Sequence, residues 1–244
     1  MSNIFGGIET LYIDLDDTLW DFSANAKVAL HYIYDKYNIV EYCEDYKRFS
    51  SIYIAKNHEL WEQYHHNQID RAYLLSERFR FTFSQVGLED DNLQSMAQSA
   101  NDDYLSYIGD LTTLVDGAVD LLQSLQQHYK VNMLSNGFHG IQFRKLRGSN
   151  LEQYFNRVIL SDDINVTKPQ REIFDYALGV CNAQAATSIM IGDNYDADIL
   201  GAHNAGWRTI HFNRSGEDIP NSVADLTVSN LSEISQLLIK LTVE

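Results

Sequence analysis

The chain has 244 residues, of which 45% are hydrophobic and 21% are charged, and its 34 acidic and 18 basic side chains give a formal net charge of -16. This composition predicts a globular protein with a sizeable core and excludes a disordered or collagenous chain. The acidic balance argues against binding to a nucleic acid polymer or to an anionic membrane, because both partners require a basic surface.

The N-terminus and the cysteines indicate the compartment. The first ten residues, MSNIFGGIET, lack the basic segment and long apolar run of a secretory signal. No stretch reaches the ~18 apolar residues that a membrane-spanning helix needs. Cys43 and Cys181 form no CxxC pattern and are typical of reduced thiols. We therefore expect a cytoplasmic protein that does not enter a membrane.

Short apolar runs predict six strands along the chain. The runs cover residues 8–14, 130–135, 157–161, 187–192, 208–212 and 224–229, the last at a sheet edge. Uninterrupted runs of this length are typical of strands that are covered on both faces. Amphipathic segments between the later runs, such as residues 170–181, indicate helical crossovers. The sequence thus predicts an α/β fold with a Rossmann-like parallel sheet and helices on both faces.

Residues 23–110 interrupt this alternation of strands and helices. They carry helical patterns over residues 26–37, 46–65, 71–86 and 92–108. An insertion of about 90 residues is too long for an ordinary crossover and too regular for a loop. We therefore predict an all-helical domain over 23–110, inserted into a core domain that combines residues 1–22 with 111–244.

The first predicted strand ends in DLDDT, residues 14–18. Carboxylates this close repel one another and raise each other's pKa, and a hard divalent ion such as Mg²⁺ relieves the repulsion. Asp14 and Asp16 point to the same side of an extended stretch, so one could attack a substrate and bind a metal while the other transfers protons. For this short pattern alone, an acidic loop with an Asp helix cap is the alternative.

Two polar segments follow the next two predicted strands. Ser135-Asn136-Gly137 offers a hydroxyl, an amide and a flexible backbone to phosphate oxygens, although the same tripeptide also forms simple turns. Lys168-Pro169 precedes the predicted helix over 170–181, where Pro169 suits the first turn and Lys168 lies near a helix N-terminus that favours an anion. A solvated lysine in front of a helix is the alternative.

The fourth predicted strand ends in GDNYDAD, whose acids Asp193 and Asp198 could complete a Mg²⁺ shell or cap a helix. Each of the four segments follows a different strand, in the order Asp-x-Asp, Ser, Lys, Asp-Asp. In combination they resemble the four motifs of the haloacid dehalogenase superfamily, with no departure in the motifs themselves. The insertion over 23–110 resembles that family's helical cap of the first type.

The resemblance implies a Mg²⁺-dependent phosphate monoester hydrolase. Asp14 would be the nucleophile that forms an aspartyl-phosphate, and Asp16 would protonate the leaving alkoxide and then deprotonate the hydrolytic water. The implied metal ligands are the Asp14 carboxylate, the Asp16 backbone carbonyl and Asp193, with Asp198 supporting the shell. The ion would neutralise the repulsion between carboxylate and phosphate.

The resemblance also implies a phosphate site. Ser135, the Asn136 backbone and Lys168 would hold the phosphoryl oxygens, and Thr18 would fix the first loop beside them. The expected ligand is therefore a small phosphorylated metabolite.

Other branches of the superfamily share this core. Haloacid dehalogenases need no Mg²⁺ and lack the second acid, so Asp16 and Asp193 argue against that branch. Phosphonate hydrolysis needs a cap lysine, although solvated surface lysines are the alternative for each candidate. The candidates by location are Lys27, Lys36, Lys47 and Lys56. A sugar-phosphate phosphatase or phosphomutase remains open, because the cap decides whether water or substrate accepts the phosphoryl group.

Segments in the cap and after the first motif resemble the pyrimidine 5′-nucleotidase branch, which implies a nucleoside 5′-monophosphate as substrate. They are NHELW (57–61), QIDR (68–71), ERF (77–79) and LWDF (19–22). Trp20, Phe22 and Trp61 could stack on the base. Packing within the core or the cap is the alternative for each of the three.

Arg144, Lys145 and Arg147 form a basic cluster that we interpret as a solvated helix face, although it could favour the approach of an anion. A function of a different class, a catalytically silent binding module, would have lost one of the motif acids, and all of them are present. We expect a monomer or homodimer.

Overall fold

The computed structural model describes residues 4–88 and 92–241 and divides the chain into two compact units. The core unit combines Met1–Phe22 with Thr112–Glu244, and the cap unit spans Ser23–Leu111. The boundary after the cap unit lies one residue beyond the expected position.

A parallel sheet forms the centre of the core unit. Its strands are β1 (Thr10–Ile13), β2 (Lys130–Ser135), β3 (Arg157–Leu160), β4 (Ser188–Gly192), β5 (Arg208–Phe212) and β6 (Leu226–Val228). Within the described residues the order is β3-β2-β1-β4-β5-β6, and every pairing is parallel. The six predicted strands are confirmed to within two residues at each end, and β6 lies at the edge.

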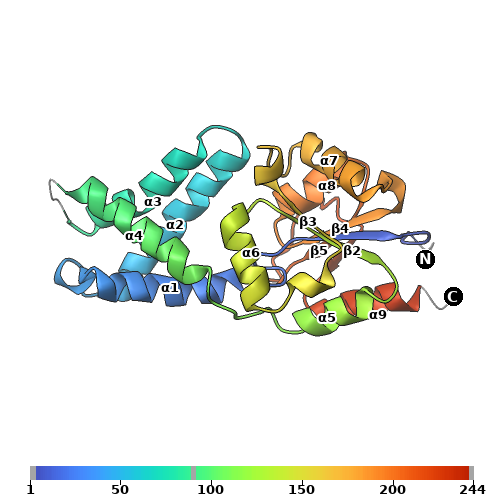
Figure 1. The fold of residues 1–244 in the computed structure, drawn as a ribbon, viewed down its shortest axis with the longest axis horizontal. Coiled ribbons are helices and arrows are strands. Elements are labelled where there is room, and N and C mark those ends of the chain that lie inside the picture. The colour runs from blue at the N-terminus through green and yellow to red at the C-terminus, as the bar shows by residue number, and fades with distance from the viewer. Residues whose placement is uncertain (1–3, 89–91, 242–244) are drawn as a thin grey trace. The chain divides into compact units, whose positions relative to one another are not determined.

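Helices cover both faces of the sheet, as predicted. The core helices are α5 (Ala118–Leu125), α6 (His139–Gly148), α7 (Arg171–Cys181), α8 (Gly201–Asn204) and α9 (Leu231–Lys240). On one face, α7 packs Ile173, Phe174 and Ala177 against apolar side chains of the four strands β1 to β4. On the opposite face, α5 and α9 lie side by side (Figure 1).

The chain forms a turn between β3 and α7 that the sequence did not reveal. The backbone N–H of Gln170 donates to the Thr167 carbonyl at 2.9 Å, and α7 begins only at Arg171. Pro169 therefore lies before the helix, and the prediction that it belongs to the first helical turn is wrong. Lys168, which precedes it through a cis peptide bond, is held by this turn.

The cap unit is built from helices in its described residues. They are α1 (Phe22–Lys36), α2 (Tyr46–His65), α3 (Arg71–Gln85) and α4 (Leu93–Ile108). Asp45 and Asp70 cap α2 and α3 by accepting backbone N–H groups of the first turns. Aromatic packing fills the interior, where the rings of Tyr53 and Phe79 are 4.6 Å apart.

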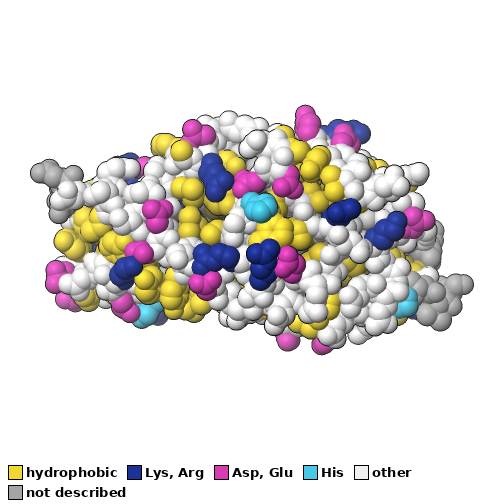
Figure 2. Space-filling model, viewed as in Figure 1, with side chains coloured by type: hydrophobic (Ala, Val, Ile, Leu, Met, Phe, Trp, Pro, Cys, Tyr) yellow, Lys and Arg dark blue, Asp and Glu magenta, His cyan; other side chains and the backbone are white. Residues whose placement is uncertain are grey.

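The surface carries charges of both signs. Acidic and basic side chains are interspersed over the face shown in Figure 2. None of the described helices is long and apolar enough to cross a membrane.

Candidate active site

Polar side chains gather at the carboxyl ends of the central strands. β1 has β2 on one side and β4 on the other, and from there the chain adds strands outward in opposite directions. Ligands of open α/β sheets bind at such a switch point. Asp14 follows β1, Ser135 ends β2 and Asp193 follows β4, so the sheet brings together residues that are far apart in sequence.

Lys168 lies at the centre of the first cluster. Its Nζ is 2.7 Å from Asp14 Oδ1, 2.6 Å from Asp198 Oδ1 and 2.7 Å from the Leu134 carbonyl oxygen. An ammonium group has three protons, and these three contacts use all of them. Burial alone would lower the pKa of Lys168, but the two carboxylates outweigh burial and raise that pKa. The ammonium therefore stays charged although its side chain is buried.

Two residues hold this cluster in shape. The Asn136 side chain accepts the backbone N–H of Lys168 at 2.8 Å and donates to the Lys168 carbonyl at 2.9 Å, which fixes the Lys168 backbone to the end of β2. Gly192 leaves room for Asp198, because a Cβ at position 192 would lie 2.1 Å from Asp198 Oδ2.

Asp14, Asp193 and Asp198 form an acidic cluster in which Asp14 and Asp198 are buried and Asp193 is partly exposed. One carboxylate oxygen of each lies within 4.8 Å of those of the other two. Burial raises the pKa of Asp14 to about 7, with Lys168 opposing the rise and neighbouring carboxylates adding to it. Burial, Asp14 and Asp198 raise the pKa of Asp193 well above its ordinary value. Three carboxylates against one ammonium leave two negative charges when all are ionised, a surplus that fits a divalent cation with oxygen ligands.

Thr18 connects the first loop to the last. Its hydroxyl donates to Asp193 Oδ1 at 3.1 Å and accepts the backbone N–H of Asp193 at 3.0 Å. Asp17 adopts the left-handed conformation (φ 55°) in the turn that leads to Thr18. Thr18 is fully buried and is directed at a carboxylate, so it can serve the phosphate site only by fixing these loops.

Asp16 belongs to a second cluster, which it forms with α6. Lys145 Nζ lies 2.5 Å from Asp16 Oδ1, and Gln142 Nε2 donates to Asp16 Oδ2 at 2.9 Å and to Ser135 Oγ at 2.8 Å. Lys145 is only 4% exposed, so the prediction of a solvated basic face is wrong for this residue. Gln142 was not among the expected site residues. Spacing of three residues places both side chains on one face of a helix, but spacing alone does not show what that face meets.

The three aromatic candidates for base stacking have different surroundings. Trp20 has no exposed surface, and Lys145 Nζ lies 4.4 Å from its ring centre, which favours packing within the core over base stacking on Trp20. Phe22 is half-buried, with its ring centre 6.4 Å from that of Trp20. Trp61 belongs to the cap unit and is half-buried against Tyr64. Base stacking on Phe22 or Trp61 stays a prediction.

Comparison with known proteins bears on these motifs. The chain is 30% identical over 232 residues to the pyrimidine 5′-nucleotidase YjjG of Escherichia coli K12, covering 94% of this chain and 97% of that protein. It is 33% identical over 206 residues to the pyrimidine 5′-nucleotidase PynA of Streptococcus pneumoniae, covering 83% of each.

A solved structure and a family profile agree with these relatives. The HAD-hydrolase YfnB from Bacillus subtilis, in a crystal structure bound to magnesium, superposes with a TM-score of 0.84 at 27% identity, covering 95% of this chain and 98% of that chain. The profile of haloacid dehalogenase-like hydrolases matches residues 8–206. The four motifs, the parallel sheet and these matches agree: the chain belongs to the haloacid dehalogenase-like hydrolase family.

Proposed function

We propose that this chain is a Mg²⁺-dependent phosphatase that hydrolyses pyrimidine nucleoside 5′-monophosphates. The observation that carries the chemistry is the acidic cluster of Asp14, Asp193 and Asp198 around Lys168, with Asp16 two residues beyond Asp14. The similarity to two pyrimidine 5′-nucleotidases over most of the chain supports the substrate class.

Asp14 and Asp16 carry the two chemical steps. An Asp14 carboxylate oxygen attacks phosphorus and forms an aspartyl-phosphate, and the electron pair of the broken P–O bond goes to the ester oxygen. Asp16 gives a proton to that oxygen. Asp16 then takes a proton from the water that attacks the aspartyl-phosphate, which releases inorganic phosphate and restores Asp14.

Asp14, Asp193 and the Asp16 backbone carbonyl would hold the Mg²⁺ ion. When bound, the ion supplies positive charge that offsets the repulsion between the phosphate and these carboxylates. Asp198 accepts Lys168 on one oxygen and the Asn194 backbone N–H, at 3.1 Å, on the other. Both contacts support its assignment as a residue that orders the shell.

Ser135, the Asn136 backbone and Lys168 form the proposed phosphate site. Because the three protons of the Lys168 ammonium are already donated within the protein, Lys168 would contribute its positive charge there. Ser135 Oγ accepts the Gln142 amide at 2.8 Å and the Gly137 backbone N–H at 3.2 Å. A hydroxyl has two acceptor positions and one proton. Because the protein uses both acceptor positions, the hydroxyl proton is the group that can meet a phosphoryl oxygen.

The cap lysines offer little support for phosphonate hydrolysis. Lys36 Nζ lies 2.7 Å from Asp103 Oδ2, and Lys56 Nζ lies 2.8 Å from Glu59 Oε1. These ion pairs favour structural roles for two of the four candidates. We further propose a cytoplasmic monomer or homodimer, in keeping with the free thiols of Cys43 and Cys181.

A substrate panel tests the proposal. UMP, dTMP, AMP and a sugar phosphate are assayed with Mg²⁺ and with EDTA, and phosphate release is measured. We expect pyrimidine monophosphates to give kcat/KM at least about tenfold above the others, since losing paired polar contacts in a base pocket costs 1 kcal/mol or more. We expect EDTA to abolish activity. A preference for sugar phosphates would overturn the substrate class, and no Mg²⁺-dependent hydrolysis of any ester would favour a silent binding module.

A further inference from the structure

Both oxygens of the Asp16 carboxylate are bound by side chains of α6. Lys145 holds Oδ1 at 2.5 Å, and Gln142 holds Oδ2 at 2.9 Å. Two bonds from one rigid helix fix both the position and the rotation of the carboxylate plane. One hydrogen-bond partner would be enough to stabilise the charge of a carboxylate. Two partners also fix the direction in which the Asp16 carboxyl group points.

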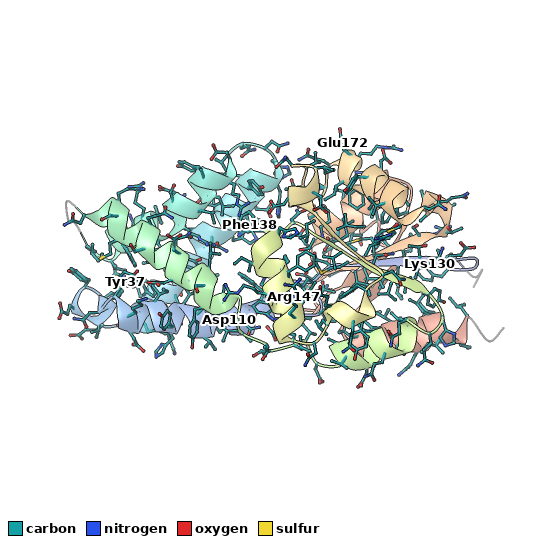
Figure 3. All side chains as sticks on the ribbon, viewed as in Figure 1. Tyr37, Asp110, Lys130, Phe138, Arg147 and Glu172 are labelled. Atoms are coloured by element: carbon teal, nitrogen blue, oxygen red, sulfur yellow. The ribbon has the colours of Figure 1, made fainter. Side chains whose placement is uncertain are left out.

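Lys145 is itself held on several sides. Its ammonium lies 4.4 Å from the Trp20 ring centre and 5.6 Å from that of Phe22. Lysine is almost never buried to this extent without a partner, and a cation over an aromatic face gains about 0.5–2 kcal/mol. The buried Trp20 ring thus packs against the Lys145 ammonium and keeps it close to Asp16. Arg147, two residues further along α6 and marked in Figure 3, is instead 67% exposed in its side chain.

Gln142 needs a glycine in the neighbouring motif. A Cβ at position 137 would lie 2.2 Å from Gln142 Nε2, so only glycine lets this side chain cross to Asp16. On its way, Gln142 also donates to Ser135. One amide therefore connects the proposed acid–base residue to the proposed phosphate site.

We propose that Lys145 and Gln142 are positioning residues that aim the Asp16 carboxyl group at the leaving-group oxygen. The inference rests on the proposed function, since it assigns these residues to proton transfer in phosphate ester cleavage. Asp14 forms the new O–P bond while the ester P–O bond breaks, and the proton of Asp16 goes to the departing oxygen. Lys145 and Gln142 contact the Asp16 carboxyl group, with Gln142 also bound to Ser135, and they act on the leaving-group oxygen only through Asp16.

The contribution of Lys145 and Gln142 to the rate of ester cleavage should therefore depend on the leaving group. A nucleoside leaves as an alkoxide and needs the proton during cleavage. A p-nitrophenolate ion is stable without one, so formation of the aspartyl-phosphate from p-nitrophenyl phosphate does not need an aimed Asp16. Only the later attack of water needs Asp16 for both substrates.

The test compares Lys145→Met and Gln142→Met with wild type, using rapid-quench single turnovers of UMP and the pre-steady-state burst of p-nitrophenolate. Proton transfer by a positioned group contributes about 10²–10⁴-fold to a rate. We therefore expect each variant to lose ~10–100-fold in nucleoside release from UMP, with KM within about twofold of wild type. The burst rate with p-nitrophenyl phosphate should stay within about twofold in Lys145→Met, followed by a slower steady state. In Gln142→Met, which also removes a hydrogen bond to Ser135, the burst rate should fall by less than the UMP rate does.

Three controls separate a positioning role from a general effect of substitution in α6. Arg147→Met removes a charge from the same helix at an exposed position and should match wild type on both substrates. Lys145→Arg keeps the cation and should recover part of the UMP rate. Adding either Met substitution to Asp16→Asn should produce little further loss, because all act on one proton transfer.

Equal losses on both substrates, or no loss on UMP, would overturn the inference. If Lys145→Met does not fold, as judged by circular dichroism, Gln142→Met decides the question because it removes no charge. The proposed function is tested separately, by showing that the wild type hydrolyses UMP and that Asp14→Asn does not. A failure of the positioning role can therefore be told apart from a failure of the function itself.

Discussion

The candidate active site contains two lysine–aspartate clusters that differ in their balance of charge. In the Lys168 cluster one ammonium serves Asp14 and Asp198, and Asp193 lies close by, so negative charge is in surplus. In the second cluster Lys145 serves Asp16 alone, at 2.5 Å. The negative surplus of the first cluster fits an added cation, whereas the second pairs one ammonium with one carboxyl group. In the function we propose, the charge around Asp14 serves metal binding and the contacts to Asp16 serve its orientation.

The largest expected effect comes from Asp14, the proposed nucleophile. Asp14→Asn keeps the shape of the side chain but removes the attacking carboxylate, so we expect turnover to fall on the order of 10⁴-fold or more. The fold should be retained, since Asn can still accept the Lys168 ammonium. Phosphate release and circular dichroism are the measurements. Activity near that of wild type would show that Asp14 is not the nucleophile. The two clusters could then no longer be assigned to different roles.

The next effect concerns the shared ammonium. Lys168→Met leaves Asp14 and Asp198 buried without their cation, and breaking a buried ion pair costs about 3–5 kcal/mol. We expect the free energy of unfolding, measured by urea titration without Mg²⁺, to fall by that amount. Arg147→Met removes an exposed ion pair with Glu152 and should cost no more than about 1 kcal/mol. Similar losses in both variants would mean that burial does not set the strength of these pairs.

The smallest effect is a pH dependence of metal binding. The pKa of Asp14 in the folded protein is raised to about 7, so protons compete with Mg²⁺ for this carboxylate at and below that pH. Calorimetric titration should show apparent Mg²⁺ affinity that is level above about pH 8 and falls by roughly tenfold per pH unit below pH 7.

The same shift has an effect on stability with a definite sign. The carboxyl of Asp14 ionises near 3.8 when unfolded and at about 7 when folded, so its contribution to the stability of the metal-free protein is lost as pH rises between these values. Added Mg²⁺ should restore stability above pH 7. An affinity and a stability that are both independent of pH over this range would contradict a strained acidic cluster.

Much of the fold could be predicted from local pattern. Continuous apolar runs marked the six strands found in the described residues, because a strand that is covered on both faces is apolar on both faces. Asp14, Ser135, Lys168 and Asp193 could be assigned to one site because parallel strands share a carboxyl edge. Pro169 was misplaced because a turn closed by Thr167 and Gln170 is not visible in helical spacing.

The environment of individual charged and aromatic side chains could not be predicted. Lys145 looked like a member of a solvated basic face, yet it is buried against Asp16, 129 positions earlier in the chain. For Trp20 the sequence left base stacking and core packing open, and the side chain has no exposed surface. Both cases have the same cause, since exposure depends on what lies against a side chain and not on its neighbours in sequence.

The sequence by itself determined the α/β class, the helical insertion and the four motifs at the ends of strands, because periodicity and strand order are properties of the chain. Only the tertiary structure decided which lysine neutralises which aspartate, and that a Cβ at Gly137 or Gly192 would displace the side chain of Gln142 or Asp198. Lys168 is 154 positions from Asp14 and 30 from Asp198, and Lys145 is 129 positions from Asp16. These contacts form only once the sheet has assembled and the helices have packed against it.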